Sequence, residues 1–246
     1  MLNVLYTEIL KLKRAKILWL LPIGGILPSV LILLIIMGNS KTSGVHWNWE
    51  LAFENNILFM SLIMAVALFS LISGYVFSRE YTENMVNTLY TYPVDKSKFV
   101  FAKLMVILII IFATLAINFG FMLAGGMFVI QESLNFHLLM EEIKKQLWIG
   151  SMFFVLSPVS AVLGVIGKNV IPPIVLGISA VITNVIVCNS KYIDVFPWCI
   201  PTDYVFRANA HDPKMITVKA WIILGATFMI SLVALIGYLK KSDVHA

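Results

Sequence analysis

Residue patterns that carry catalysis in other proteins occur here only in incomplete form. The nearest match to a phosphate-binding loop runs from Gly164 to Asn169, but Val162 stands where its first glycine belongs. Asn169 replaces the Ser or Thr whose hydroxyl would bind Mg²⁺. We therefore interpret this segment as a turn between two helices and predict no nucleotide site on this chain.

Other reactive side chains are few and widely spaced. The histidines lie outside the apolar segments, with neither an HExxH motif nor a serine nucleophile elbow: His46, His137, His211 and His245. The pair Glu141-Glu142 is similar to the paired glutamates of intramembrane peptidases, but it falls in an expected outer loop and precedes Lys144 and Lys145. We predict no enzyme activity, metal site or cofactor on this chain.

The composition is that of an integral membrane protein. Of the 246 residues, 60% are hydrophobic and 13% are charged, and the mean hydropathy is +0.91. A soluble catalytic domain usually needs about 100 residues or more, and such a chain leaves little room for one. Any energy-supplying domain is expected on a separate chain.

Six segments are apolar and long enough to cross a bilayer, which takes about 20 residues. The third exceeds that length, so it is expected either to tilt or to end early near Gly120. The expected fold is all-α, a polytopic membrane protein with one transmembrane domain over residues 1–246. The expected spans are residues 17–37, 57–77, 104–130, 147–166, 170–188 and 220–239.

The distribution of charge predicts the orientation. Most Lys and Arg residues flank the spans on the side that holds the N-terminus, which places both termini in the cytoplasm. This bias accounts for the basic composition without any nucleic-acid partner. Before the first span, Leu5, Ile9 and Leu12 recur at helical spacing, so we expect an amphipathic helix in the inner interface, acting either as an anchor or as a partner contact.

One long polar segment, Ser78 to Lys103, separates the second and third spans. Ser78 is a candidate cap for a helix in which Tyr81, Met85 and Leu89 recur every four residues. Pro93 is expected to stop that helix, and Asp95 to cap the next one. The pattern predicts a short cytoplasmic helix, a proline turn and a basic return into the membrane.

At these residues the chain resembles the permease subunits of ABC-2 type exporters. The acidic stretch Glu80 to Met85, the turn Pro93 to Lys96 and the final Lys103 match that pattern, whereas Asn84 replaces a frequent Gly and Asp95 a frequent Ser. The resemblance implies a coupling helix that contacts a separate ATPase subunit, and the alternative is a simple solvated loop. The implied coupling residues are Glu80, Tyr81, Glu83, Asn84, Met85, Leu89, Pro93 and Lys96.

The resemblance also implies partners and cargo. ATP and Mg would be bound by the ATPase subunit, and the permease would form a homodimer or a heterodimer that expels an amphipathic compound. The chain's size and its run Thr7 to Arg14 resemble the small permeases that protect bacteria against bacitracin or lantibiotics. The alternative function is a scaffold or sensor that holds a cytoplasmic partner without moving cargo.

Polar residues inside the expected spans could join helices or line a substrate path. No Asp, Glu or Arg is expected well inside a span, which argues against a proton-coupled carrier. Interhelical hydrogen bonding is the favoured role of these residues. They are Asn118, Ser157, Ser160, Thr183 and Asn184.

The loop after the fifth span combines helix-breaking prolines with aromatic residues. By resemblance it would be an outer gate with short helical pieces, and the alternative is an aromatic belt at the lipid headgroups. Cys188 and Cys199 lie at or beyond this end of the span, and we favour two free thiols, although a disulfide stays open. The candidate gate residues are Pro197, Trp198, Pro201 and Tyr204.

Overall fold

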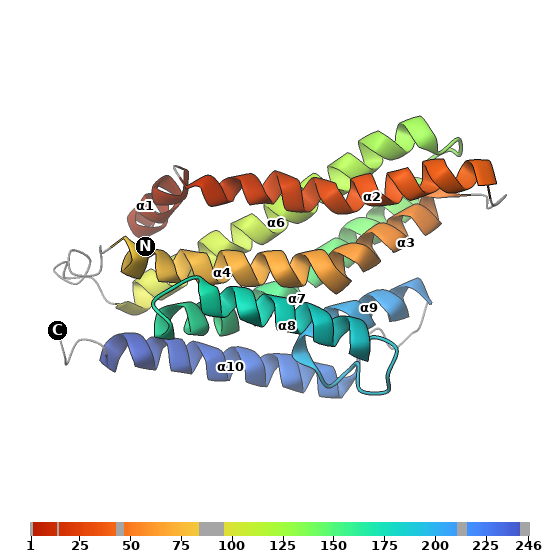
Figure 1. Cartoon of the computed structure of the whole chain (residues 1–246). Coiled ribbons are helices and arrows are strands. Elements are labelled where there is room, and N and C mark those ends of the chain that lie inside the picture. The colour runs from red at the N-terminus through yellow and green to blue at the C-terminus, as the bar shows by residue number, and fades with distance from the viewer. Residues whose placement is uncertain (1, 14, 43–46, 84–95, 211–215, 242–246) are drawn as a thin grey trace.

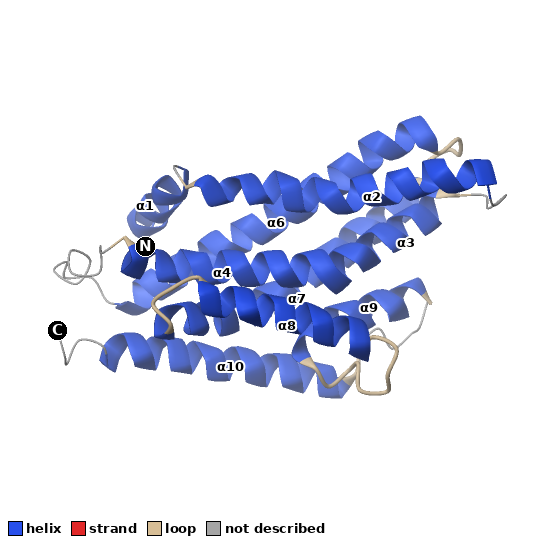
Figure 2. Ribbon diagram, in the orientation of Figure 1, coloured by secondary structure: helices blue, strands red, loops and turns tan. Residues whose placement is uncertain are grey.

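The computed structural model describes the whole chain except residues 1, 14, 43–46, 84–95, 211–215 and 242–246. Within these described parts every regular element is a helix, which confirms the all-α prediction there. Figure 1 and Figure 2 show most of the helices side by side along one axis, with α1 lying across one end of the bundle. We call this the α1 end, and the opposite end the α9 end.

The elements follow the hydrophobic segments of the sequence. In chain order they are α1 (Leu2–Lys13), the 3₁₀ turn η1 (Lys16–Trp19), α2 (Leu20–Thr42), α3 (Trp49–Phe59), the π turn η2 (Met60–Met64), α4 (Ala65–Thr82), α6 (Lys96–Val129), α7 (Phe136–Ile166), α8 (Ile171–Val187), the 3₁₀ turn η3 (Pro197–Cys199), α9 (Ile200–Asn209) and α10 (Val218–Lys241). Helices α3, η2 and α4 continue one into the next, and we call them the α4 rod.

Five helical stretches of the described residues are long and apolar enough to cross a membrane. Helix α8 corresponds to the remaining expected span, but its 17 residues extend only about 26 Å at 1.5 Å per residue. The five are Ile17–Gly38, Trp49–Thr82, Ser97–Val129, Phe136–Ile166 and Val218–Leu239. The second and fourth begin well before the predicted residues 57 and 147.

One alternative is excluded and two local expectations were wrong. Helix α6 does not end early near Gly120 but continues to Val129, close to the predicted end of the third span, and its later glycines make room for other helices: a Cβ at Gly125 would meet the side chain of Leu33. Glu141 and Glu142 lie within α7 rather than in a loop, since Asn135 caps that helix earlier by accepting a hydrogen bond from the His137 amide (3.0 Å). Ser78 caps nothing, because α4 continues through it to Thr82.

The bundle is held together by close contact of small residues as well as by aliphatic side chains. At the crossing of α4 and α7, a Cβ added to Gly164 would lie 2.7 Å from the carbonyl oxygen of Gly74. Such approaches of one backbone to another are typical of helices that pack within a membrane. This crossing fixes α7 against the α4 rod and thereby places the elements that carry the polar sites below.

Candidate functional site

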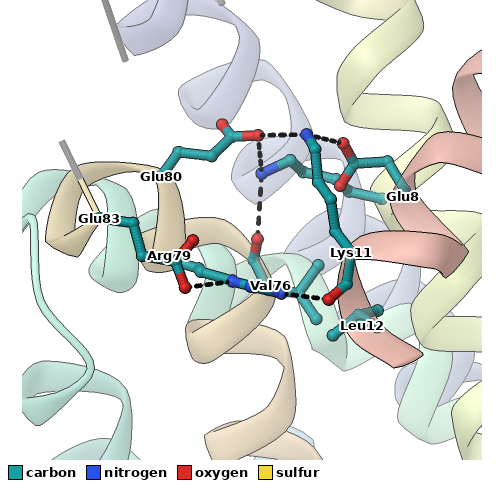
Figure 3. Close-up of a pocket in the computed structure, with 8 residues that line it drawn as sticks. Glu8, Lys11, Leu12, Val76, Arg79, Glu80 and Glu83 are labelled. Carbon is teal, nitrogen blue, oxygen red and sulfur yellow. Dashed lines mark hydrogen bonds and ion pairs between the residues drawn. The ribbon is translucent and has the colours of Figure 1, made fainter. Parts of the chain in front are cut away.

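Charged side chains from three helices gather at the α1 end of the bundle. Figure 3 shows this group, in which α1, α4 and α6 face one another across a small pocket. We call it the α1-end cluster and define it by Glu8, Lys11, Arg79, Glu80, Glu83 and Lys103. The helices α4 and α6 are the two that flank residues 84–95, so the cluster lies at the base of the predicted coupling segment.

The ion pair between Glu80 and the buried Lys103 forms the centre of the cluster. The Oε1 atom of Glu80 lies 2.9 Å from the Lys103 Nζ and 3.6 Å from the Lys11 Nζ. Only 4% of the Lys103 side chain is exposed, and its ammonium also donates to the Val76 carbonyl oxygen at 3.0 Å. The Phe77 ring centroid lies 5.3 Å from the same nitrogen. A charge so deeply buried needs a partner of opposite charge, and Glu80 supplies it.

Arg79 attaches α1 to the end of α4. Its Nη1 donates to the main-chain carbonyl oxygen of Lys11 at 2.7 Å, and its Nε donates to Glu83 at 2.6 Å. The last carbonyls of a helix have no partners within the helix. At the C-terminal end of α1, the Arg79 guanidinium hydrogen-bonds one of these carbonyls and interacts favourably with the negative end of the helix dipole. Lys11 also pairs with Glu8 at 2.6 Å. These contacts join α1, α4 and α6 into one unit.

Helical spacing explains why these groups meet. Val76, Glu80 and Glu83 are separated by four and three residues, so they share one face of α4. Lys103 lies two turns beyond Lys96, the first residue of α6, and faces that surface. The ion pair between α4 and α6 was not predicted, although opposite charges at the two ends of one polar segment were a signal that could have indicated it.

The predicted coupling residues are only partly within the described structure. Glu80 and Tyr81 are partly exposed and Glu83 is exposed, all near the C-terminal end of α4. Lys96 begins α6. The remaining four, Asn84, Met85, Leu89 and Pro93, lie outside the described residues.

Asn118 takes part in a buried hydrogen-bond network between α2, α3 and α6. Its Nδ2 donates to the Gly25 carbonyl oxygen (2.9 Å) and to the Ser29 Oγ (3.0 Å). The Asn56 Nδ2 donates to the Asn118 Oδ1 at 2.9 Å. All three polar side chains are almost completely buried. Ser29 and Asn56 were missed in the sequence, because an isolated polar residue in a span gives no indication of which helix it will face.

The other candidate path residues have partners elsewhere. Ser157 and Ser160 are buried in α7, and Ser157 donates to its own helix at the Phe154 carbonyl (2.8 Å). Thr183 donates to its own helix at Ser179 (2.8 Å). Asn184 reaches two other elements, the η2 turn and α9. The hydrogen bonds of Asn118, Ser157, Thr183 and Asn184 therefore belong to separate groups.

The candidate gate residues form ordered helical structure. Pro197 begins η3, and Pro201 lies in the first turn of α9, where a missing N–H costs nothing. These prolines therefore start helices rather than break them. Trp198 and Tyr204 are buried in the hydrophobic core, so they do not form a belt that faces lipid headgroups. Cys188 and Cys199 are both free thiols, as favoured.

Long apolar helices with a charged group at the base of a polar segment define a polytopic membrane protein, and comparison with known proteins identifies its family. The model of the ABC-2 family transporter proteins matches residues 4–184, and the chain belongs to this family. The bacitracin transport permease protein BCRB of Bacillus licheniformis is 31% identical to it over 208 residues, which cover 84% of this chain and 98% of that relative. The predicted resemblance to ABC-2 permeases is confirmed.

Proposed function

We propose that this chain is the membrane-spanning subunit of an ATP-driven exporter and that it receives mechanical work from a separate ATPase subunit. The observation that carries the proposal is the α1-end cluster. It binds together the two helices that flank residues 84–95 and adds α1 to them through Arg79. A force applied to the segment between α4 and α6 would therefore move three helices as a rigid body.

The proposed arrangement in the membrane has six spans, with α8 as the short one and both termini in the cytoplasm. In Figure 1 the α1 end also holds the C-terminal end of α10, as an even number of crossings requires. Trp19 is 73% exposed at the start of α2, and Trp148 and Trp221 are half-exposed and packed edge to face 5.8 Å apart. Exposed tryptophans are typical of the two membrane interfaces.

The proposed cargo is an amphipathic compound, and the proposed assembly contains two permease copies or a permease and a related chain. A relative named for bacitracin transport supports a peptide antibiotic as cargo. ATP and Mg would be bound by the ATPase. Helices α2, α6, α7, α8 and α10 present large apolar side chains to their surroundings, which is compatible with cargo taken directly from the lipid phase.

The test is a co-purification and export experiment with an ABC ATPase as the candidate partner subunit. The double variant Glu83→Lys with Met85→Asp reverses one charge and adds another where the coupling segment begins. We expect that this variant no longer co-purifies with the ATPase and that cells producing it are no longer resistant to bacitracin. Glu132→Lys makes the same charge reversal at an exposed site between α6 and α7 and should keep both. Retention of association and resistance in the double variant would disprove the coupling proposal, and association without any resistance in the native pair would favour a sensor.

A further inference from the structure

Helix α9 covers the end of the bundle opposite α1. Figure 1 shows it beside the outer parts of α3 and α7. Its buried face consists of Ile200, Tyr204, Val205 and Ala208, each less than a tenth exposed. Helix α9 packs against α7, and there burial first, and then the negative charge of Glu142, raise the pKa of Tyr204 to about 12. A helix of 10 residues is not stable by itself, so contacts with its neighbours are needed to fix its position.

At its N-terminal end, α9 is connected to the α4 rod through one side chain of α8. The Asn184 Nδ2 donates to the Thr202 Oγ1 on α9 (3.2 Å) and to the Leu62 carbonyl oxygen (3.0 Å). Leu62 lies in η2, the π turn between α3 and α4. A π turn interrupts the regular backbone hydrogen bonding of an α-helix, and such turns often lie at functional sites. Asn184 is fully buried, so both contacts are shielded from water.

At its C-terminal end, α9 is connected to α7 through Lys145. The Lys145 Nζ lies 3.1 Å from the Oδ1 of Asn209, the last residue of α9, and 2.7 Å from the Oε1 of Glu142. Glu142 is 1% exposed. The lysine therefore neutralises a buried carboxylate and, at the same time, places a positive charge at the negative end of the α9 dipole.

We propose that Asn184 and Lys145 are positioning residues that hold α9 in place at its two ends, and that Asn184 connects α9 to the π turn of the α4 rod. The other end of the rod carries Arg79 and Glu80 of the α1-end cluster. Movement of the rod would change the Leu62 contact of Asn184 and release the N-terminal end of α9. These contacts lie within the chain itself, so they can be tested without transport and without the ATPase.

The chain contains its own reporter for this movement. Cys199 directly precedes α9 and is completely buried. Burial above all, with the charges of Cys188 and Asp203, raises the pKa of the Cys199 thiol to about 12. A maleimide reacts with the thiolate, so Cys199 should react only when α9 leaves its place. Cys188 is partly exposed and provides the reference rate in the same molecule.

The first test compares two substitutions at Thr202 in the full-length chain in lipid vesicles. Thr202→Val keeps the side-chain volume but removes the oxygen that accepts from Asn184, whereas Thr202→Ser keeps the oxygen and removes a methyl group. We expect Cys199 in Thr202→Val to react about fivefold faster with maleimide, the factor that corresponds to one lost hydrogen bond. Thr202→Ser should react at nearly the native rate. A larger effect of Ser than of Val would show that packing alone holds α9 and would overturn the proposal.

The second test addresses the contact of Asn184 with Leu62 and the contacts of Lys145. Asn184→Ala should accelerate Cys199 more than Thr202→Val does, because the Leu62 carbonyl also loses its partner. Lys145→Met should accelerate it as well, and adjacent Lys144→Met, at an exposed position on α7, should not. Equal rates in the two lysine variants would disprove the role of Lys145. Because general unfolding would accelerate Cys188 together with Cys199, a parallel rise at both cysteines would also overturn the proposal.

Discussion

At the residue scale, Glu80 connects three helices through a single oxygen. Lys103 is nearly inaccessible, and its other polar contact is the uncharged Val76 carbonyl. Removal of a buried partner leaves a charge without compensation, which costs more than the pair itself contributes. The Arg79–Glu83 pair is closer to solvent, with 35% of the Glu83 side chain exposed, and pairs of that kind contribute little. Glu80 should therefore contribute more to the free energy of unfolding than Glu83, although both were predicted as coupling residues.

We expect Glu80→Gln to lower the free energy of unfolding by about 3 kcal/mol, since it leaves Lys103 buried without a counter-charge. Glu83→Gln should lower it by no more than about 0.5 kcal/mol. Unfolding of the purified variants in detergent, followed by circular dichroism, measures both. Adding Lys103→Met to Glu80→Gln should restore most of the loss. If the double variant is as unstable as Glu80→Gln alone, the ion pair is not the cause.

Asn118 allows a second measurement at this scale. Asn118→Leu removes the contacts to Gly25, Ser29 and Asn56, and interhelical hydrogen bonds in membranes contribute about 0.6 kcal/mol each. We therefore expect a loss of about 2 kcal/mol in unfolding free energy. Thr183→Val should have almost no effect, because Thr183 bonds only within its own helix. Equal stabilities of the two variants would contradict a joining role for the network.

At the scale of elements, the α4 rod contacts most of the other helices. At the α1 end of the bundle it carries part of the α1-end cluster, its middle packs against α7 and α8, and its π turn contacts Asn184. The crossing with α7 depends on Gly164, where the nearest atom of the rod belongs to the Gly74 backbone. A backbone atom cannot rotate away as a side chain can, so this crossing should tolerate no added methyl group.

Substitution of Gly164 tests that crossing. Gly164→Ala should destabilise the protein by about 2 kcal/mol, within the range for overpacking of a tight core. Gly225→Ala on α10 provides the matched control, since a Cβ there would meet nothing within 4 Å, and it should be neutral or slightly stabilising because Ala favours a helix more than Gly does. Thermal unfolding in detergent compares the two. A neutral Gly164→Ala would show that α7 can move away from the rod.

At the scale of the whole molecule, the two ends of the bundle have different chemistry. The ion pairs at the α1 end surround a polar segment, whereas those at the α9 end, such as Lys145–Glu142, lie beside a short buried helix with hydrogen-bonded ends. Such an asymmetry suits a permease that is driven from one side and opens on the other. The orientation proposed above assigns the α9 end to the outside.

Cysteine labelling tests this orientation. A membrane-impermeant maleimide added to intact cells at neutral pH should label the chain once, at Cys188, and Cys188→Ser should abolish the signal. Cys199 should stay unlabelled because burial keeps its thiol protonated far above neutral pH, with its pKa near 12. The signal should not increase when the cells are permeabilised. Labelling that requires permeabilisation would place the α9 end in the cytoplasm.

Much of this molecule could be predicted from hydrophobic length and charge. The apolar segments predicted the helices, because a backbone in lipid must satisfy its own hydrogen bonds. Helix ends were less predictable: α7 begins at Phe136 and the α4 rod at Trp49, since caps and packing extend a helix beyond its apolar part. Glu142 could not be assigned to a buried site, because its partner Lys145 also contacts Asn209, a residue of α9 far along the chain.

The sequence by itself determined that this is a membrane protein, which family it resembles and where its polar segment lies, because these properties depend on local composition and short motifs. Only the tertiary structure decided which residues act together. Glu80 with Lys103, Asn184 with Thr202 and Leu62, and Lys145 with Asn209 are contacts between helices. Such pairings depend on how each helix is rotated and crossed against its neighbours, and close packing of side chains and backbone sets these angles only in the folded bundle.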